Sequence, residues 1–305
     1  MKRQDIDSLL KLPVAELIAL ADKTRKEFSG KKLDLCSIMN AKSGLCDQDC
    51  KFCAQGNSRS SGAEVYPLKE KKEILEAALR AKEIGAERFG IVTSGDSLSN
   101  DELRRICDAV FEITTKFGIK TCASLGTLRE DDFCRLRKAG LSRYHHNLET
   151  SESYFPNIVS THSFSDRVAT VCAAKKAGLK VCSGGIIGMG ENMGDRVELA
   201  LKLKELDVDS VPINVLVPIK GTPFGEFITL PPFEAIRTIA IFRIILKDKV
   251  IKIAAGRESV LKDFQAMAFL GGANGMLIGG YLTIKGREAV LDRRLVEEIQ
   301  RLWQT

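Results

Sequence analysis

The sequence lacks the features that mark membrane-spanning, secreted and nucleic-acid-binding proteins. No apolar run approaches the ~18–20 residues that cross a bilayer, and Met1-Lys2-Arg3-Gln4-Asp5 does not begin a signal peptide. The 46 Lys and Arg residues exceed the 40 Asp and Glu residues by six, with no basic block beyond Lys69–Lys72. This thin positive surplus is no evidence for nucleic-acid binding. We expect a cytoplasmic protein with neither a membrane nor a nucleic-acid partner.

Cysteine, in contrast, is abundant. The 305 residues include nine cysteines, although aromatic residues make up only 6% of the chain. Disulfides are rare in the reducing cytoplasm, and an odd number of thiols cannot all pair. Metal binding or catalysis is therefore the better explanation for the cysteines. A hydrophobic content of 44% with 28% charged residues is typical of a globular chain with a sizeable core.

Short apolar runs alternate with helical patterns from about residue 33 onward. In residues 100–117, Leu103, Ile106 and Val110 recur at helical spacing. Glycines are expected to end several of the helices, at Gly85, Gly118, Gly140 and Gly178. The predicted strands are Leu33–Met39, Arg88–Thr93, Thr121–Ser124, Arg143–Leu148, Lys180–Ile186, Ser210–Leu216, Val250–Ala254 and Gly275–Ile278.

Eight strand–helix units predict an α/β fold, a closed (βα)8 barrel of the TIM type. We expect one domain over residues 1–305, with residues 1–30 as an N-terminal helical extension that includes a helix from Val14 to about Phe28. An open, doubly wound sheet is the structural alternative. In a barrel, the active site lies at the carboxyl ends of the strands.

Three cysteines follow the first predicted strand, at Cys46, Cys50 and Cys53. Three thiols within eight residues can face one centre only from a loop, because a helix would scatter them. A structural zinc site usually has four protein ligands, and the nearest further thiol is Cys36, inside the strand. A four-iron cluster held by three cysteines would leave one iron open to an exogenous ligand. A zinc site and three incidental loop cysteines are the alternatives.

The Cys-x3-Cys-x2-Cys spacing, with Phe52 before the last cysteine, resembles the radical S-adenosylmethionine (SAM) superfamily. The resemblance implies a [4Fe-4S] cluster whose open iron is chelated by the amino and carboxylate groups of SAM. One electron from the reduced cluster would then cleave the sulfonium, giving methionine and a 5′-deoxyadenosyl radical. A reducing electron-transfer protein of the flavodoxin or ferredoxin type is the implied partner.

Further segments between about residues 30 and 285 resemble biotin synthases. They are Ala123–Leu128, Tyr144–Thr150, Val181–Glu191, Ser210–Asn214, Gly221–Pro223, Ala255–Glu258 and Gly272–Asn274. The resemblance implies a transferase that inserts sulfur into dethiobiotin to form biotin and that acts as a homodimer. Two alternatives remain: another radical SAM enzyme of the same subgroup, such as a hydrogenase-maturation or pyrrolysine-pathway enzyme, and an iron–sulfur carrier or redox sensor.

Biotin synthases carry an auxiliary two-iron cluster, held by three Cys and one Arg, that donates the sulfur. By resemblance, Cys122, Cys182 and Arg257 match three of its ligands, but Gly90 stands where a second-strand cysteine belongs. Alternate barrel strands contribute layers of four side chains, and the first strand carries Cys36. We therefore expect Cys36, Cys122, Cys182 and Arg257 to hold a rearranged auxiliary cluster, with two irons or with four. A buried core cysteine at Cys36 is the alternative.

The resemblance also assigns ligand contacts. Asn147 and Asn214 match residues that face the dethiobiotin ureido ring, where an amide can both donate and accept, and Asn147 also reaches SAM. Arg167 matches the arginine that contacts the methionine carboxylate. The remaining implied contacts are Phe52, Glu149, Gly184 and Ile186 for SAM, and Thr283 for the valeryl carboxylate of the substrate.

Several positions depart from the family pattern or fall outside it. Glu149 replaces an aspartate, His145 replaces an asparagine, and Ile284 occupies the place of a second threonine. For His145, a binding role and a satisfied core or rim histidine are equally supported. The last three cysteines fall on predicted helices outside the barrel, where we expect them to fill the core: Cys107, Cys134 and Cys172.

Overall fold

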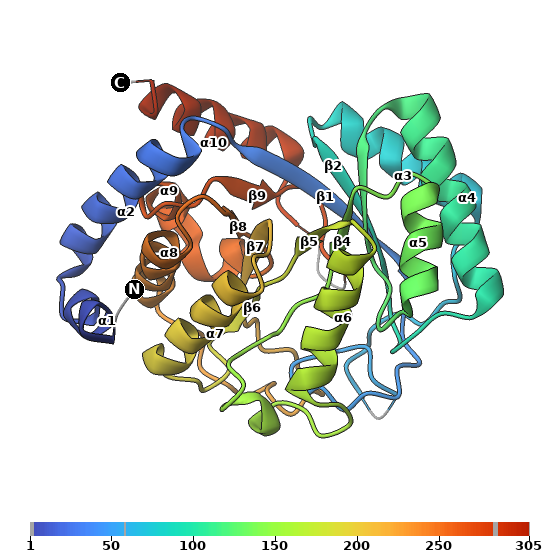
Figure 1. The fold of residues 1–305 in the computed structure, drawn as a ribbon, viewed down its shortest axis with the longest axis horizontal. Coiled ribbons are helices and arrows are strands. Elements are labelled where there is room, and N and C mark those ends of the chain that lie inside the picture. The colour runs from blue at the N-terminus through green and yellow to red at the C-terminus, as the bar shows by residue number, and fades with distance from the viewer. Residues whose placement is uncertain (1–2, 58, 283–285, 305) are drawn as a thin grey trace.

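Parallel strands form a closed barrel in the computed structural model, which describes residues 3–57, 59–282 and 286–304 (Figure 1). The strands pair in the order β5-β4-β3-β2-β1-β9-β8-β7-β6, and β5 also pairs with β7. The sheet therefore closes on itself, with β5 and β6 as two parts of one barrel strand, and the predicted (βα)8 barrel is confirmed. The strands are β1 (Asp34–Lys42), β2 (Arg88–Thr93), β3 (Lys120–Ser124), β4 (Arg143–His145), β5 (Lys180–Cys182), β6 (Gly185–Ile187), β7 (Ser210–Val215), β8 (Val250–Ile253) and β9 (Gly275–Leu277).

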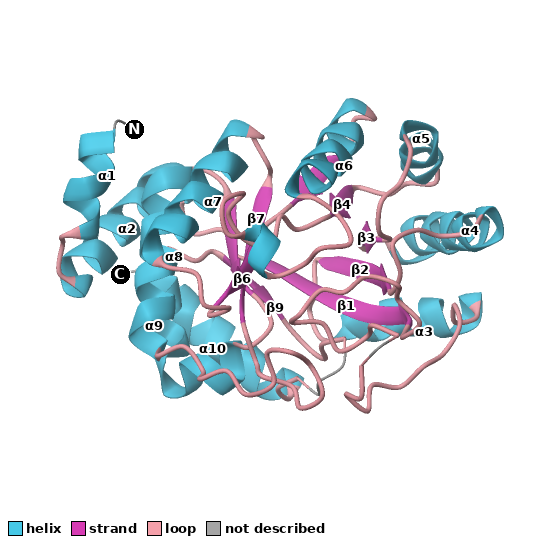
Figure 2. Ribbon diagram, turned by 90° about the horizontal axis from the view of Figure 1, so that it is seen from below, coloured by secondary structure: helices cyan, strands magenta, loops and turns pink. Residues whose placement is uncertain are grey.

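Helices surround the strands, as the view from below shows (Figure 2). Two helices, α1 (Arg3–Leu10) and α2 (Val14–Ser29), precede β1, and α2 packs against α8. The predicted extension at residues 1–30 thus contains two helices, while a single domain stays a prediction. The other helices are α3 (Lys71–Glu83), α4 (Asn100–Phe117), α5 (Glu130–Lys138), α6 (Phe164–Lys176), α7 (Met193–Glu205), α8 (Pro232–Leu246), α9 (Gln265–Leu270) and α10 (Ala289–Leu302), with short turns η1 (Phe155–Asn157), η2 (Arg257–Leu261) and η3 (Lys262–Phe264).

Local signals explain where the helices begin and end. The hydroxyl of Ser99 accepts a hydrogen bond from the backbone of Glu102 (3.2 Å), and the Glu102 carboxylate accepts one from the Ser99 backbone (2.9 Å), a capping box that starts α4. Gly118 ends the same helix at φ 66°, a left-handed conformation that glycine adopts without a Cβ clash. The glycines predicted to end the other helices have positive φ as well.

The fifth predicted strand, Lys180–Ile186, is interrupted. The Ser183 amide donates to Ser210 on β7 (2.9 Å), whereas the Gly184 amide leaves the ladder and donates to the Asn147 side chain (3.2 Å). A Cβ on Gly184 would lie 2.0 Å from the Pro212 carbonyl oxygen, so this close crossing requires glycine. The predicted fourth strand, Arg143–Leu148, is also shorter, because its last residues turn toward Gly184.

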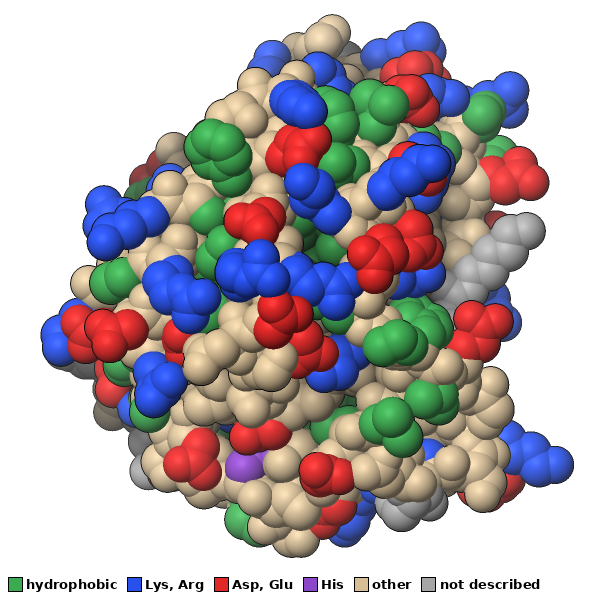
Figure 3. Space-filling view, turned by 90° about the vertical axis from the view of Figure 1, so that its right-hand side faces the viewer, with side chains coloured by type: hydrophobic (Ala, Val, Ile, Leu, Met, Phe, Trp, Pro, Cys, Tyr) green, Lys and Arg blue, Asp and Glu red, His purple; other side chains and the backbone are tan. Residues whose placement is uncertain are grey.

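The face to the right in Figure 1 carries both basic and acidic side chains (Figure 3). Some of them pair between neighbouring helices, as Lys71 on α3 does with Glu112 on α4 (2.9 Å). Within the part of the chain that the structure describes, no helix combines the length and the hydropathy needed to cross a bilayer.

A fully buried arginine joins the N-terminal helices to the barrel. Arg243 on α8 is 0% exposed, and burial, together with the nearby Arg25, lowers the pKa of its guanidinium to about 10. At neutral pH the group is therefore still charged. Its hydrogen-bond acceptors are neutral oxygens from several segments: the carbonyls of Gly272, Lys247 and Lys249, the hydroxyl of Ser29 and the side chain of Asn274.

Replacing this arginine should destabilise the whole barrel. We expect Arg243→Met to lower the free energy of unfolding by on the order of 3 kcal/mol, because each buried oxygen left without a donor costs about 1–3 kcal/mol. Chemical denaturation of the iron-free protein measures the change. The control is Arg301→Ala, whose side chain is 70% exposed and which should cost less than about 0.5 kcal/mol. Equal stabilities of the two variants would contradict this role.

Candidate active site

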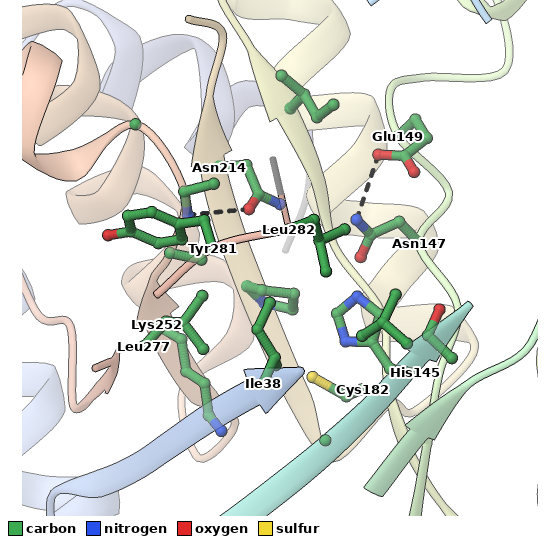
Figure 4. A pocket seen from close by; sticks show the side chains of 18 of the residues that line it. Ile38, His145, Asn147, Glu149, Cys182, Asn214, Lys252, Leu277, Tyr281 and Leu282 are labelled. Atoms are coloured by element: carbon green, nitrogen blue, oxygen red, sulfur yellow. Dashed lines mark hydrogen bonds between the residues drawn. The ribbon is translucent and has the colours of Figure 1, made fainter. Parts of the chain in front are cut away.

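One cavity of about 430 Å³ enters the barrel from the carboxyl ends of the strands. At its mouth lie side chains that follow the strands, among them Cys53, Asn147 and Glu149. Deeper in the barrel, the lining includes the thiols of Cys36, Cys122 and Cys182. Figure 4 shows His145, Cys182 and Lys252 on the barrel side of this space and Asn147, Glu149 and Asn214 nearer its mouth. The cavity thus joins the two groups of cysteines that the sequence singled out.

The loop after β1 holds the first group of cysteines. The Cys46 amide donates to the Gln55 carbonyl (3.3 Å), and the Gln55 amide donates to the Cys53 sulfur (3.4 Å). Burial raises the pKa of Cys50 to about 12, even though Arg167 opposes this shift. The Cys50 thiol is therefore protonated at neutral pH in the absence of metal, and it loses its proton only when a positively charged metal centre binds it. This donor set, three thiols on a loop at the mouth, fits an iron–sulfur cluster.

Among the described residues, no three His, Cys, Asp or Glu side chains converge closely enough to hold a single metal ion. A four-iron cluster places its ligands on different irons, so its thiolates need not meet at one point. The lack of a single-ion site among the described residues is therefore compatible with Cys46, Cys50 and Cys53 as cluster ligands.

A carboxylate clamps this loop to the loop that follows β4. Asp49 accepts hydrogen bonds from the Ser160 amide (2.9 Å) and hydroxyl (2.6 Å) and from the Thr161 amide (3.2 Å) and hydroxyl (3.0 Å). Next to it, the Lys51 amide donates to the Ile158 carbonyl (2.9 Å). These contacts hold the chain on both sides of Cys50.

A histidine extends the clamp to the arginine at the mouth. His162 Nδ1 lies 2.6 Å from the side-chain oxygen of Gln48, and Arg167 Nε donates to His162 Nε2 (3.0 Å). Nδ1 must donate and Nε2 must accept, so the ring is neutral in this arrangement. Burial and the charge of Arg167 lower the pKa of His162, in agreement with a neutral ring. Arg167 also donates to the Asn147 carbonyl (2.9 Å) and lies 3.7 Å from Glu149.

Glu149 occupies a tight turn beside this arginine. Its φ of 70° is rare for a residue with a side chain, and its carbonyl accepts from the Ile186 amide (2.8 Å). A Cβ on Gly185 would lie 2.3 Å from that carbonyl oxygen, so the turn packs directly on the glycine. Burial raises the pKa of the Glu149 carboxyl, and Arg167 opposes the shift. The backbone at Gly184 and Gly185 therefore packs closely on Pro212 and on Glu149. The Gly-Gly sequence alone did not indicate these contacts within the protein.

The two predicted asparagines face the cavity with part of each amide already bonded. Asn147 donates to Glu149 (3.2 Å) and accepts from Gly184 (3.2 Å). Asn214 donates to the Gly185 carbonyl (3.1 Å) and accepts from the Ala255 amide (3.1 Å). An amide has two donor hydrogens and two acceptor lone pairs, so each side chain can still make one bond of either kind. Both are held in fixed orientations toward the cavity (Figure 4).

The second group of thiols, Cys36, Cys122 and Cys182, comes from β1, β3 and β5. These are alternate strands of the barrel, as expected for side chains that share one layer. Burial raises the pKa of both Cys36 and Cys122. Burial would also raise the pKa of Cys182, but the neighbouring His145 and Lys252 outweigh it and lower the pKa to about 6. On β2, Gly90 pairs with Cys122, and a Cβ at Gly90 would lie 3.1 Å from the Ile38 side chain. Ile38 therefore occupies part of the space that a side chain at position 90 would need.

Cations lie next to these thiols. Lys252 on β8 is 3% exposed and pairs with Asp34 (2.6 Å), and Arg88 (3.2 Å) and Arg143 (3.7 Å) approach the same carboxylate. Arg143 is 4% exposed, and its Nε and Nη1 have no hydrogen-bond partner among the described residues. Three cations against one carboxylate leave a buried positive excess, which suits thiolates or an anionic cluster.

Arg257, predicted to complete the ligand set of the three cysteines, is not among the residues that line the cavity with them. It is 1% exposed, and its guanidinium donates to both oxygens of Asp292 on α10 (2.8 Å each) and to the Leu277 carbonyl (3.2 Å). The reason is its position after β8, in the turn η2, where the chain has already left the barrel wall. The β8 side chain that faces the thiols is that of Lys252. A charged residue inside an otherwise apolar strand was the signal that could have identified it.

The other predicted residues divide between the cavity and the periphery. Phe52 and Ile186 line the cavity, and His145 lies there next to Cys182, whose thiol raises the pKa of the imidazole against the effect of burial. Thr283 and Ile284 fall outside the described residues. Cys107 and Cys134 pack partly buried against the core, but Cys172 is exposed on α6, so the prediction that it fills the core is wrong.

Comparison with protein families gives two matches along the chain. The Radical SAM superfamily matches residues 42–214, and the Biotin and Thiamin Synthesis associated domain matches residues 212–300. Relatives named biotin synthase include one from Thermotoga neapolitana, 57% identical over 89% of this chain and 97% of its own length. Another, from Geobacter sulfurreducens, is 45% identical over 98% of this chain and 92% of its own length.

Solved structures with a similar fold are more distant in sequence. Methylornithine synthase (PylB) superposes with a TM-score of 0.84 at 19% identity, covering 99% of this chain and 92% of its own. HydG, a maturase of the [FeFe]-hydrogenase, gives 0.80 at 16% identity, covering 95% of this chain and 69% of its own. At these identities the likeness shows the barrel fold alone.

The carboxylate clamp predicts how the cysteine loop responds to mutation. Asp49→Ala removes four acceptor contacts and leaves two backbone amides to find water, so the loop should open more often. We expect faster hydrogen–deuterium exchange at residues 46–53 in the iron-free protein, by about tenfold. The control in the same loop is Asp47→Ala, which loses one bond to Asn57 and should exchange like the wild type. Equal exchange in both variants would mean that Asp49 does not hold the loop.

Proposed function

The chain belongs to the biotin synthase family of the radical SAM superfamily, and on this basis we propose which of its residues perform each part of the reaction. It is an enzyme that inserts sulfur into dethiobiotin to give biotin, and it uses SAM and a [4Fe-4S] cluster. One observation carries the assignment of residues: a single cavity connects the cysteine loop at the mouth with three thiols inside the barrel.

Cys46, Cys50 and Cys53 hold the [4Fe-4S] cluster in this proposal. Their loop follows the first strand, is held on both sides of Cys50 by contacts with the loop after β4, and opens into the cavity. When bound, the cluster supplies the electron that cleaves SAM. The protein's part is to keep the cluster beside SAM and to exclude water from the cavity.

SAM lies between this loop and the segments after β4 and β5. Arg167 offers a planar donor to its carboxylate, and His162 fixes the orientation of the guanidinium. Glu149 faces the same region as an acceptor for hydroxyl groups, held in place by Arg167 and Asn147. The remaining SAM contacts are Phe52, Gly184 and Ile186. The Gly184 amide contributes indirectly, because it donates a hydrogen bond that orients the Asn147 side chain.

Dethiobiotin lies deeper, with its ureido ring between Asn147 and Asn214. A cyclic urea needs donors for its oxygen and acceptors for its N–H groups, and each asparagine retains one of each. Apolar side chains such as Leu282 and Val92 line the same space, which suits a hydrocarbon ring and chain. Thr283 is kept as the contact for the valeryl carboxylate on the resemblance alone.

Cys36, Cys122 and Cys182 hold the auxiliary cluster that donates the sulfur. Support comes from their shared position in the cavity and from the buried cations beside them, Lys252 and Arg143. The unpartnered nitrogens of Arg143 fit an anionic group at this place. His145 lies between Cys182 and Asn147 (Figure 4). Both two and four irons remain compatible with three thiols.

The external partners follow from the reaction. A flavodoxin- or ferredoxin-type protein delivers electrons near Cys46, beside which Leu45 is 71% exposed and available for contact. We also propose, from the family resemblance alone, that the protein is a homodimer in the cytoplasm.

The SAM-cleaving role is tested at the cysteine loop. Cys50→Ala should retain the fold but form no 5′-deoxyadenosine from SAM under anaerobic reducing conditions, because the cluster loses one of its three ligands. The matched control is Cys172→Ala, an exposed thiol on α6, which should keep wild-type rates. Wild-type 5′-deoxyadenosine formation by Cys50→Ala would refute the assignment, and its absence in the wild type would favour a carrier or sensor.

The auxiliary cluster is tested separately. Cys36→Ala should lower iron and sulfide content, change the Mössbauer spectrum and abolish biotin formation, while SAM cleavage at the first cluster persists. Cys107→Ala, a partly buried cysteine on α4, is the control and should keep full iron and turnover. If Cys36→Ala retains full iron, full sulfide and biotin turnover, Cys36 is a core residue.

A further inference from the structure

The residue that the sequence suggested as a cluster ligand, Arg257, is the centre of a buried ionic network. Its guanidinium contacts Asp292 on α10 through two bonds of 2.8 Å, Glu258 at 3.2 Å, the Gln265 side chain on α9 and the Leu277 carbonyl on β9 (3.2 Å). Arg257 and Asp292 are each 1% exposed. A buried ion pair of this kind fixes the geometry of both side chains, because neither group can turn to solvent.

Glu258 connects this ionic network to the wall of the cavity. One of its oxygens accepts the Tyr281 hydroxyl (2.7 Å), and the other accepts the Arg287 amide (3.2 Å). Both Glu258 and Tyr281 line the cavity, as does Leu282. Figure 4 shows Tyr281 and Leu282 beside Asn214, on the side of the cavity opposite Glu149. The side chain of Glu258 therefore connects Arg257 with the surface that faces the substrate.

Further contacts hold the chain on either side of Tyr281 and Leu282. A Cβ on Gly286 would lie 1.8 Å from the Gly279 carbonyl oxygen, so the backbone at Gly286 is in direct contact with the backbone at Gly279. On the side of β1, Asn40 donates to the Leu282 carbonyl (3.3 Å). Tyr281 and Leu282 are thus held from two directions, by Glu258 and by Asn40.

Arg257 is needed because two carboxylates meet here. Asp292 and Glu258 both approach the one guanidinium, and the charge of Glu258 disfavours the charged form of Asp292. Without the cation, repulsion and burial would drive the partly exposed Glu258 toward water, and Tyr281 would lose its acceptor. The cation therefore keeps Glu258 turned toward Tyr281.

From these contacts we propose that Arg257 is a positioning residue for substrate binding, which acts through Glu258 to fix Tyr281 and Leu282 as a wall of the dethiobiotin site. The proposal rests on the function proposed above. It gives Arg257 no part in holding iron, and it makes the affinity for dethiobiotin depend on an ionic network outside the barrel interior.

The experiment uses the reconstituted enzyme with both clusters and compares Tyr281→Phe, Arg257→Lys and the double variant. We expect Tyr281→Phe to raise the KM for dethiobiotin about fivefold to tenfold with a nearly unchanged kcat, the effect of one lost hydrogen bond. Arg257→Lys should raise KM at least as much, since a single ammonium cannot replace three guanidinium nitrogens that bond Asp292, the Gln265 side chain and the Leu277 carbonyl at once. More 5′-deoxyadenosine should form per biotin in both, while iron, sulfide and Mössbauer spectra remain those of the wild type.

The double variant distinguishes positioning from general destabilisation. If Arg257 acts through Tyr281, the double variant should have the KM of Arg257→Lys alone, whereas independent effects would multiply. Tyr154→Phe, whose hydroxyl bonds the Met189 carbonyl elsewhere, is the matched control and should keep the wild-type KM. Multiplying effects, an unchanged KM or lost iron in Arg257→Lys would each overturn the proposal. Failure of the proposed function is distinct, because the wild type itself would then form no biotin.

Discussion

The charge balance inside the barrel constrains the rest of the site. Asp34 is the carboxylate that Lys252, Arg88 and Arg143 share, and these cations hold its pKa at about 2 against the effect of burial. Desolvating three cations for one anion is unfavourable unless further negative charge is nearby. The three thiols beside them can supply that charge as thiolates. The charge of Lys252, Arg88 and Arg143 thus favours an anionic occupant beside the thiols.

Much of the architecture could be predicted because its signals are local. The helix at residues 100–117 has a serine cap, an apolar stripe and a terminal glycine, and the structure reproduces its limits. The cysteine loop was identifiable from spacing alone. That Cys36 and Cys122 line one cavity could be expected because alternate strands of a barrel contribute side chains to the same layer.

The parts that were missed depend on where a strand ends. The resemblance assigned the ligand position to Arg257, whereas Lys252, five residues earlier, is the side chain on the barrel wall. The difference depends on β8 ending at Ile253, where Gly256 turns with a φ of 83° and crosses closely over Val215. Likewise, the break between β5 and β6 arises from the contact of Gly184 with Pro212, which is distant in sequence. Long-range backbone contacts of this kind leave no periodic pattern.

The contact between Gly90 and Ile38 has an evolutionary consequence. A Cβ at position 90 would lie 3.1 Å from the Ile38 side chain, so a cysteine placed there by one substitution would require Ile38 to shift by a few tenths of an ångström. The effect of a change at position 90 thus depends on the residue at position 38, which couples the two sites in evolution.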